Sequence, residues 1–302
     1  MTDALLQLAV VLLLPPVLLG VINKTKALFA GRVGPPVLQL WFDLVKLMRK
    51  DTVLSGTTSW VFRAGPVVGL ATTLFAALLV PIAGRAPLVS FEGDLVLFAY
   101  LLGLGRFFTV AAALDTGSSF EGMGGAREAT FACLAEPALF LGLLALVRTS
   151  GSTSLGGMLG DSLVASWSIG AASLVAVVAS LMVVLLAENS RIPFDDPNTH
   201  LELTMVHEAM VLDHGGPSLA MILYGAAIKL FVMGAIIVRI AVPYEGVDAW
   251  SGVAAFVAGM VLLAVVVGVV ESVMARLRLL QVPSLLVAAC VLSGFGVVLL
   301  GR

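Results

Sequence analysis

Charge is scarce in this sequence. Only 12% of its 302 residues are Asp, Glu, Lys or Arg, whereas a soluble globular domain carries about 25%. A water-soluble fold of this length could not cover its surface with so few charges, so the bilayer must be the solvent for most of the chain. The net charge is −2, which gives no sign of a nucleic-acid partner.

Metal ligands are scarce as well. The two cysteines, Cys133 and Cys290, form no CxxC pair, so we expect neither an iron–sulfur cluster nor a zinc site on this chain. Both lie in apolar runs and are expected to be buried and inert. His200, His207 and His214 are spaced by seven residues. Two ligands on one helix need a spacing of three or four, so we expect no metal site from the histidines.

Long apolar runs dominate instead. Hydrophobic residues make up 60% of the chain, and a membrane-spanning helix needs about 20 of them in succession. The sequence therefore predicts an all-α polytopic membrane protein, a single integral membrane domain over 1–302 with about eight transmembrane helices. The predicted spans are Leu5–Ile22, Pro66–Ala83, Leu95–Leu114, Ala129–Val147, Ile169–Ala187, Leu219–Ile240, Val253–Val270 and Leu285–Leu300.

The basic residues indicate the orientation. Of the 17 Lys and Arg residues, most fall in the first long connection, Asn23–Gly65, and in later connections on the same side of the membrane. Because positive charge is retained on the cytoplasmic side, we expect these connections in the cytoplasm and both chain termini on the outer face.

The first connection contains an amphipathic pattern. Gln39, Asp43, Lys46 and Lys50 recur at spacings of four, three and four within Val37–Lys50, with apolar residues between them. This predicts a helix lying in the cytoplasmic interface. It could be a brace on the membrane surface or a wall of an internal cavity.

The most polar segment follows the fifth predicted span. Pro193 indicates that the span has ended, and Asp196 before Pro197 suits the start of a new helix. We expect a short acidic helix from Pro197 to Asp213 between spans five and six. His207 beside Glu208 is a candidate proton carrier there.

Several ionisable residues fall inside or beside the predicted spans. A charge at the centre of a bilayer costs at least about 2.5–3.5 kcal/mol, so such residues usually face the protein interior and have partners. For Glu136 we favour proton relay over ion pairing, because Pro137 should loosen the helix there. For Arg106 both interpretations stand equally, and Glu271 could extend to the interface from a helix end. The residues concerned are Arg106, Glu136 and Lys229 inside spans, and Asp115, Glu128, Glu188 and Glu271 at their borders.

A family pattern is carried by several of these segments. They are GRVGP at 31–35, FDLVKLMRKD at 42–51, FEGMGGARE at 120–128, LAEP at 134–137, AENSRIPFDDPNTHLEL at 187–203 and HEAMVLDHGGP at 207–217. With them, the chain resembles the membrane-anchor subunit of energy-converting group 4 nickel–iron (NiFe) hydrogenases and formate hydrogenlyase. That group is similar to NADH dehydrogenase subunit 1 of respiratory complex I.

The resemblance and the buried charges together imply two sets of functional residues. The expected proton or ion path comprises Glu128, Glu136, Glu188, Asp195, Glu202, Glu208, Asp213 and Lys229. The expected docking motif comprises Arg32, Gly34, Pro35, Asp43, Lys46, Arg127, Arg191, Pro193 and Phe194. No catalytic residue and no cofactor is expected on this chain itself.

The resemblance implies a non-redox subunit of an oxidoreductase complex in the cytoplasmic membrane of a prokaryote. The NiFe centre and iron–sulfur clusters would lie in partners, the small and large hydrogenase subunits on the cytoplasmic face, with antiporter-like subunits alongside in the membrane. The alternative is the quinone-chamber subunit of a complex I-type NADH-quinone oxidoreductase. Asn23, Asn198 and His200 depart from the complex I pattern where it shapes the quinone chamber, which favours the hydrogenase branch. A stand-alone ion transporter is a third interpretation.

Overall fold

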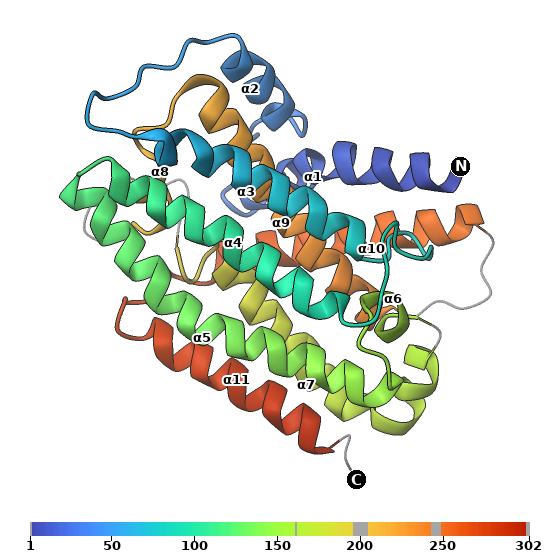
Figure 1. Ribbon diagram of the computed structural model, residues 1–302. Helices are drawn as coiled ribbons and strands as arrows, with labels where there is room; N and C mark the ends of the chain where they lie inside the picture. Colours follow the sequence, from blue (N-terminus) through green and yellow to red (C-terminus); the bar gives the residue numbers. More distant parts are fainter. Residues whose placement is uncertain (1, 161, 196–204, 243–248, 300–302) are drawn as a thin grey trace.

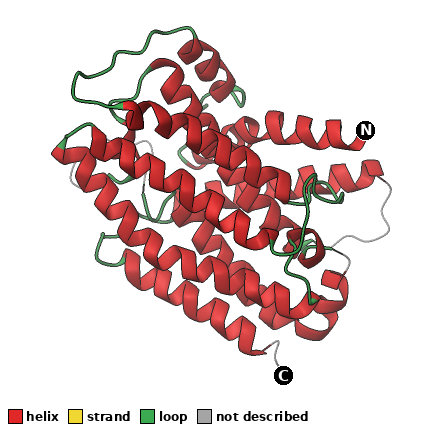
Figure 2. Cartoon of the chain, in the orientation of Figure 1, coloured by secondary structure: helices red, strands yellow, loops and turns green. Residues whose placement is uncertain are grey.

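The computed structural model describes residues 2–160, 162–195, 205–242 and 249–299. Within these ranges, eight helices are long and apolar enough to cross a membrane. The prediction of an all-α polytopic membrane protein is confirmed (Figure 2). The eight are α1 (Thr2–Phe29), α3 (Trp60–Leu79), α4 (Asp94–Asp115), α5 (Ser119–Ser150), α7 (Ser162–Glu188), α9 (Gly216–Ala241), α10 (Ala249–Val273) and α11 (Val282–Leu299). The short helices are α2 (Gln39–Met48), α6 (Leu155–Met158) and α8 (His207–Val211).

The long helices pack as a bundle in which neighbours in space are not always neighbours in sequence. The α11 helix lies against α5 and α7, α1 lies against α10, and α3 lies between α4 and α9 (Figure 1). The α9 helix contacts α1, α2, α3, α7 and α10 and is the most deeply buried of the eight. Residues on α4, α5, α7 and α9 can therefore meet in the middle of the molecule.

Small polar side chains tie α5, α7 and α11 together. The Ser180 hydroxyl on α7 donates to the Ala289 carbonyl of α11 at 2.7 Å. The Ser293 hydroxyl on α11 lies 2.6 Å from the Ser180 oxygen and 3.2 Å from the Ala138 carbonyl of α5. Both serines are fully buried. Because lipid supplies no hydrophobic drive for helix association, close packing and such hydrogen bonds hold membrane helices together.

A proline in α1 leaves a backbone group without its usual partner. Pro16 has no N–H, so it cannot donate to the Leu12 carbonyl four residues earlier. The Tyr224 hydroxyl of α9 donates to that carbonyl at 2.8 Å. Tyr224 thus satisfies an acceptor that the bilayer interior could not.

The amphipathic pattern in the first connection forms α2, as predicted, although the helix is shorter than Val37–Lys50 at both ends. Asp43 accepts a hydrogen bond from Gln39 at 2.9 Å, and Trp41 packs on Tyr224 with ring centroids 6.0 Å apart. Leu44 is buried, whereas Phe42 is 58% exposed. The helix therefore packs on α9 through one side and leaves apolar surface on another.

Three expectations about local structure are wrong. Helix α5 begins at Ser119, ten residues before the predicted start, so Glu128 lies inside the helix and not at its border. Cys133 is exposed on the outside of α5 and only Cys290 is partly buried. The acidic helix predicted over 197–213 is not continuous, because Met205 and Val206 are non-helical and α8 spans only His207–Val211. Its part at 196–204 lies outside the described residues.

Substitution of Tyr224 tests the α1–α9 link. We expect Tyr224→Phe to lower the unfolding free energy by about 0.6 kcal/mol, the mean value of an interhelical hydrogen bond in a membrane protein. In a Pro16→Ala background the new Ala N–H can reach the Leu12 carbonyl, so Tyr224→Phe should cost much less there. Denaturant unfolding of the detergent-solubilised chain measures both differences. Equal costs in the two backgrounds would contradict this account.

Candidate functional site

A network of ion pairs centres on Arg106. This residue lies in the middle of α4, and its side chain is 9% exposed. Its guanidinium pairs with Glu136 through Nη1 and with both carboxylate oxygens of Glu188 through Nη2. Its Nε lies 3.3 Å from the Glu128 carboxylate. One cation therefore contacts three carboxylates, which its planar set of five N–H donors permits.

The helices bring these groups together from distant parts of the chain. Glu128 and Glu136 are eight residues apart on α5, roughly two turns of one helix face. Glu188 is the last residue of α7, on the other side of Arg106. Pro137 follows Glu136 inside α5. The ion pairs connect three helices and join residues up to 82 positions apart in the sequence.

Lys229 on α9 completes the network. Its Nζ lies 2.8 Å from a carboxylate oxygen of Glu188 and donates to the backbone carbonyl of Glu188 at 2.7 Å. That carbonyl belongs to the last turn of α7, where carbonyls lack intrahelical partners and a cation is favourable. The Glu188 side chain is only 2% exposed. Its negative charge is therefore compensated by the two cations, Arg106 and Lys229, and not by water.

The charges of this network do not cancel. Three carboxylates, of Glu128, Glu136 and Glu188, face two cations, of Arg106 and Lys229, so the sum is −1 when all five are ionised. An uncompensated charge away from water is costly. One added proton or monovalent cation would make the network neutral.

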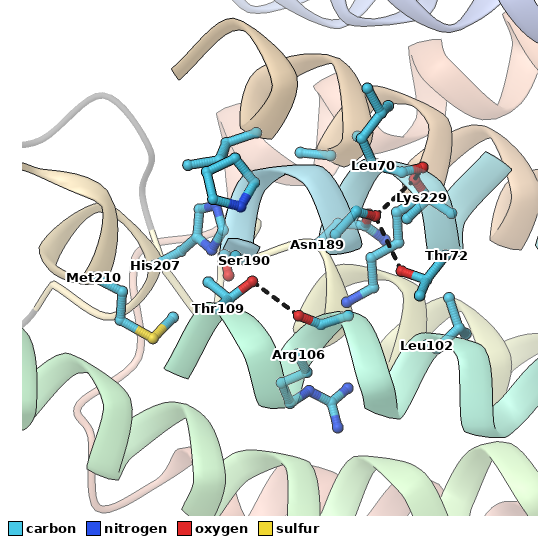
Figure 3. A pocket seen from close by; sticks show the side chains of 18 of the residues that line it. Leu70, Thr72, Leu102, Arg106, Thr109, Asn189, Ser190, His207, Met210 and Lys229 are labelled. Atoms are coloured by element: carbon cyan, nitrogen blue, oxygen red, sulfur yellow. Dashed lines mark hydrogen bonds between the residues drawn. The ribbon is translucent and has the colours of Figure 1, made fainter. Parts of the chain in front are cut away.

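Two cavities adjoin the network. The first has a volume of about 110 Å³ and lies between α3, α4, α8 and α9; Arg106, Glu128, Glu188, His207 and Lys229 all line it. Figure 3 shows the tip of Lys229 directed toward α4, which carries Arg106. The rest of its lining combines apolar residues such as Leu70 and Met210 with polar ones such as Thr72, Thr109 and Asn189.

The second cavity, of about 400 Å³, lies between α4 and α5. Glu136 lines it, together with aromatic residues such as Tyr100 and Phe107 that are exposed on the flank of the bundle. The Glu136 side chain is 47% exposed. This cavity therefore opens sideways from the network toward the outside of the chain.

A second set of ion pairs fixes the segment after α7. Glu271 of α10 lies 2.8 Å from Lys26 of α1 and 3.3 Å from Arg191. The Arg276 guanidinium lies 2.6 Å from the Asp195 carboxylate. The other Asp195 oxygen accepts the backbone N–H groups of Val206 and His207, each at 3.1 Å. Asp195 thereby holds the start of α8.

His207 projects from the start of α8 into the first cavity. Burial lowers its pKa below the usual value of about 6.5, and the nearby Glu128 carboxylate opposes this only in part. The ring is therefore neutral at pH 7. It remains a candidate proton carrier, facing the cavity that Glu128 and Glu188 also line, while Asp195 accepts the His207 backbone N–H.

The structure separates the other predicted path residues from the network. Asp213 is exposed beyond the end of α8, and its N–H donates to Glu121 at 3.3 Å. Glu208 lies on α8 and does not line either cavity. Glu202 and His200 lie outside the described residues. The seven-residue spacing of the histidines does not place His207 and His214 on one helix face, since α8 ends at Val211.

The predicted docking residues fall into two groups. Arg127, Arg191, Pro193 and Phe194 are tied into the bundle: Arg127 donates to the Met205 carbonyl at 2.8 Å, the Pro193 carbonyl accepts from Leu277, and Phe194 is buried. The second group lies on the first connection, where Arg32, Gly34, Pro35 and Lys46 are exposed and Asp43 is partly buried. The first group therefore stabilises the fold directly, and only the second offers surface.

Sequence reasoning missed or misjudged three residues. The role of Arg106 was left open between ion pairing and proton relay, although a lone arginine in an apolar helix indicates a buried partner. Glu271 does not extend to the interface: its side chain is 0% exposed and is held by Lys26 and Arg191. Arg276 gave no signal, because its partner Asp195 lies 81 residues away.

Comparison with known proteins decides the family. The family profile described as NADH dehydrogenase matches residues 2–301. The chain belongs to the NADH dehydrogenase family. Two members of this family from Escherichia coli K12 are similar to it: formate hydrogenlyase subunit 4, 32% identical over 91% of this chain and 90% of that protein, and hydrogenase-4 component C, 32% identical over 80% and 75%. The resemblance inferred from the motifs is confirmed.

More distant relatives agree with the fold. An NADH-quinone oxidoreductase subunit of Rubrobacter xylanophilus is 27% identical over 68% of this chain and 62% of that protein. A chain of the membrane-bound sulfane sulfur reductase, an archaeal respiratory membrane complex, superposes with a TM-score of 0.84 over 98% of both chains at 21% identity. These relatives are parts of multisubunit membrane complexes, and this NADH dehydrogenase family member is a multi-pass subunit of such a complex.

The stacking of His214 on Phe62 predicts that the stability of the fold depends on pH. His214 lies parallel to Phe62 with ring centroids 3.9 Å apart, and burial lowers its pKa to about 4. Because the unfolded chain has the usual pKa of about 6.5, it binds more protons than the folded chain between these values, so stability should fall as the pH falls through that window.

The His214→Phe variant keeps the stacking on Phe62 but cannot titrate. We expect it to lack the loss of stability that His214 causes as the pH falls. Thermal unfolding midpoints of the wild type and the variant at pH 7 and pH 4.5 measure it. The same pH dependence in both proteins would show that His214 does not contribute.

Proposed function

We propose that this chain is the membrane-anchor and ion-translocation coupling subunit of a group 4 NiFe hydrogenase complex. The observation that carries the proposal is the Arg106 network, which has one carboxylate in excess and lies between two cavities. The hydrogenase assignment rests on the two relatives that are 32% identical, one of which matches over nine-tenths of its length.

The redox centres belong to partner subunits in this proposal. An iron–sulfur cluster is held by four thiolates as a rule, and the two cysteines of this chain, on α5 and α11, cannot supply them. The chain's own contribution is to bind partners and to move an ion. The NiFe centre and the clusters would lie in the small and large hydrogenase subunits.

These partners would dock at the end of the bundle that carries the first connection and α8. Most of the basic residues lie at this end, which by the distribution of positive charge faces the cytoplasm of a prokaryotic cell, with both termini outside. The exposed Arg32, Pro35 and Lys46 offer contact surface there. A change in a docked partner would reach the network through the Arg276–Asp195 pair and His207.

The ion would be the charge that neutralises the network. A proton or sodium ion entering the first cavity meets Glu188 and Lys229, and the carboxylate on the far side of Arg106 is Glu136. From the half-exposed Glu136 it would pass to an antiporter-like subunit in the membrane. In this proposal the redox state of the partner determines where the added ion is held. It lies either at Glu188 or, on the far side of Arg106, at Glu136.

Substitution of Glu136 tests the path. We expect Glu136→Gln to leave hydrogen evolution by the detergent-solubilised complex largely intact and to abolish ion pumping by inverted membrane vesicles, because the amide cannot take up the ion. Glu92→Gln is the matched control: Glu92 is exposed at the opposite end of the bundle and accepts from Thr153. Unchanged pumping by Glu136→Gln would remove this residue from the path.

The assembly is tested separately. Affinity purification of the tagged chain from a mild detergent, followed by mass spectrometry, should recover a NiFe large subunit and its small subunit. Recovery of flavin- and NADH-binding subunits in their place would assign the chain to a complex I-type enzyme.

A further inference from the structure

The two cavities share a wall that consists of few residues. Among the residues that the structure describes, Leu102, Arg106 and Glu188 alone line both of them. Leu102 is apolar and cannot solvate an ion, so the polar part of the wall is the ion pair between Arg106 and Glu188. A direct route from one cavity to the other therefore runs past this pair.

The partners of Arg106 are distributed on both sides of the wall. Glu128 lines the first cavity, Glu136 lines the second, and Glu188 lines both. Within the described residues, the ion pairs of Glu128 and Glu136 are both made with Arg106. The guanidinium therefore has a carboxylate to bind whichever way it turns.

Glu188 tolerates the loss of Arg106 better than the other two carboxylates. Lys229 lies 2.8 Å from it and also binds its backbone carbonyl. If the guanidinium turns away, Glu188 keeps one cation and is not left as an isolated buried charge, the arrangement that is strongly destabilising. The network thus has two arrangements, one with the guanidinium on Glu188 and one with it turned away. In each of them every carboxylate can be compensated once one ion has been added.

We propose that Arg106 is the gate of the ion path, a positioning residue whose permanent positive charge closes the opening between the two cavities. The proposal rests on the proposed ion path. In the structure the gate is closed, with the guanidinium on Glu188 and Glu136 together. It opens when an ion at Glu188 competes with the guanidinium, which then turns toward Glu128 and Glu136 on α5. Arginine suits this task because it stays charged at every physiological pH.

The proposal predicts a leak that does not depend on turnover. Inverted vesicles containing the complete complex, with no electron donor, are given a pH gradient, and its decay is followed with a pH-sensitive dye. A parallel set is given a sodium gradient. We expect Arg106→Gln to accelerate the decay of one gradient by at least about tenfold, which corresponds to about 1.4 kcal/mol off the barrier. Residual coupled pumping should fall accordingly.

Three further variants make the test specific. Arg239 is another buried arginine on a membrane helix, and it lines neither cavity. Vesicles that contain the Arg239→Gln complex should therefore keep their gradient as long as the wild type. In the double variant Arg106→Gln/Glu136→Gln the leak should fall back toward the wild-type rate, because the path beyond the gate is interrupted. Arg106→Lys keeps the charge but has a compact ammonium group, so it should assemble and leak at an intermediate rate.

Two results would overturn the gate. One is a tight Arg106→Gln complex, or a tight Arg106→Lys complex where the glutamine variant does not assemble. The other is a leak that is as fast in the double variant as in Arg106→Gln, because the ion would then bypass Glu136. Normal pumping by Glu136→Gln would instead remove Glu136 from the proposed ion path, and it is measured in a separate, turnover-dependent assay.

Discussion

The arrangement of this molecule depends on one guanidinium surrounded by three carboxylates. Arg106 cannot give up its proton inside a protein, so its charge has to be met wherever the bundle places it. Helices α5 and α7 supply the carboxylates that meet the charge of Arg106 on α4, and Lys229 of α9 joins the network through Glu188. The same contacts link four helices and form the polar part of the wall that the two cavities share. Under the proposed function, stability and ion movement depend on the same few atoms.

The rest of the bundle keeps that centre in place with ordinary membrane chemistry. Serine hydroxyls bind α5, α7 and α11, and the Tyr224 hydroxyl serves the carbonyl that Pro16 leaves free. At the basic end, Glu271 and Asp195 anchor the segment after α7 against α1 and α10. The short helix α8, which reaches the first cavity through His207, is held through the same segment. A partner that moves this segment would therefore act on the network at close range.

The sequence predicted what depends on local pattern and failed on what depends on distant contacts. Eight apolar runs gave the helices, and the amphipathic spacing gave α2, because both follow from the solvent around the chain. Glu271 was misjudged because Lys26 and Arg191, which bury it, are remote in sequence. The central position of Arg106 was open for the same reason. The acidic helix was predicted as continuous, whereas Met205 and Val206 are non-helical and Asp195 binds the N–H groups at the start of α8, which no local propensity shows.

Glu136 has a consequence for how the protein is made. In the isolated chain the Glu136 side chain is 47% exposed and lines the cavity that opens on the flank of the bundle. A charge exposed to hydrocarbon costs at least about 2.5–3.5 kcal/mol, and a neighbouring subunit that covers the flank would remove that cost. A newly inserted copy is therefore least stable before it meets its neighbours.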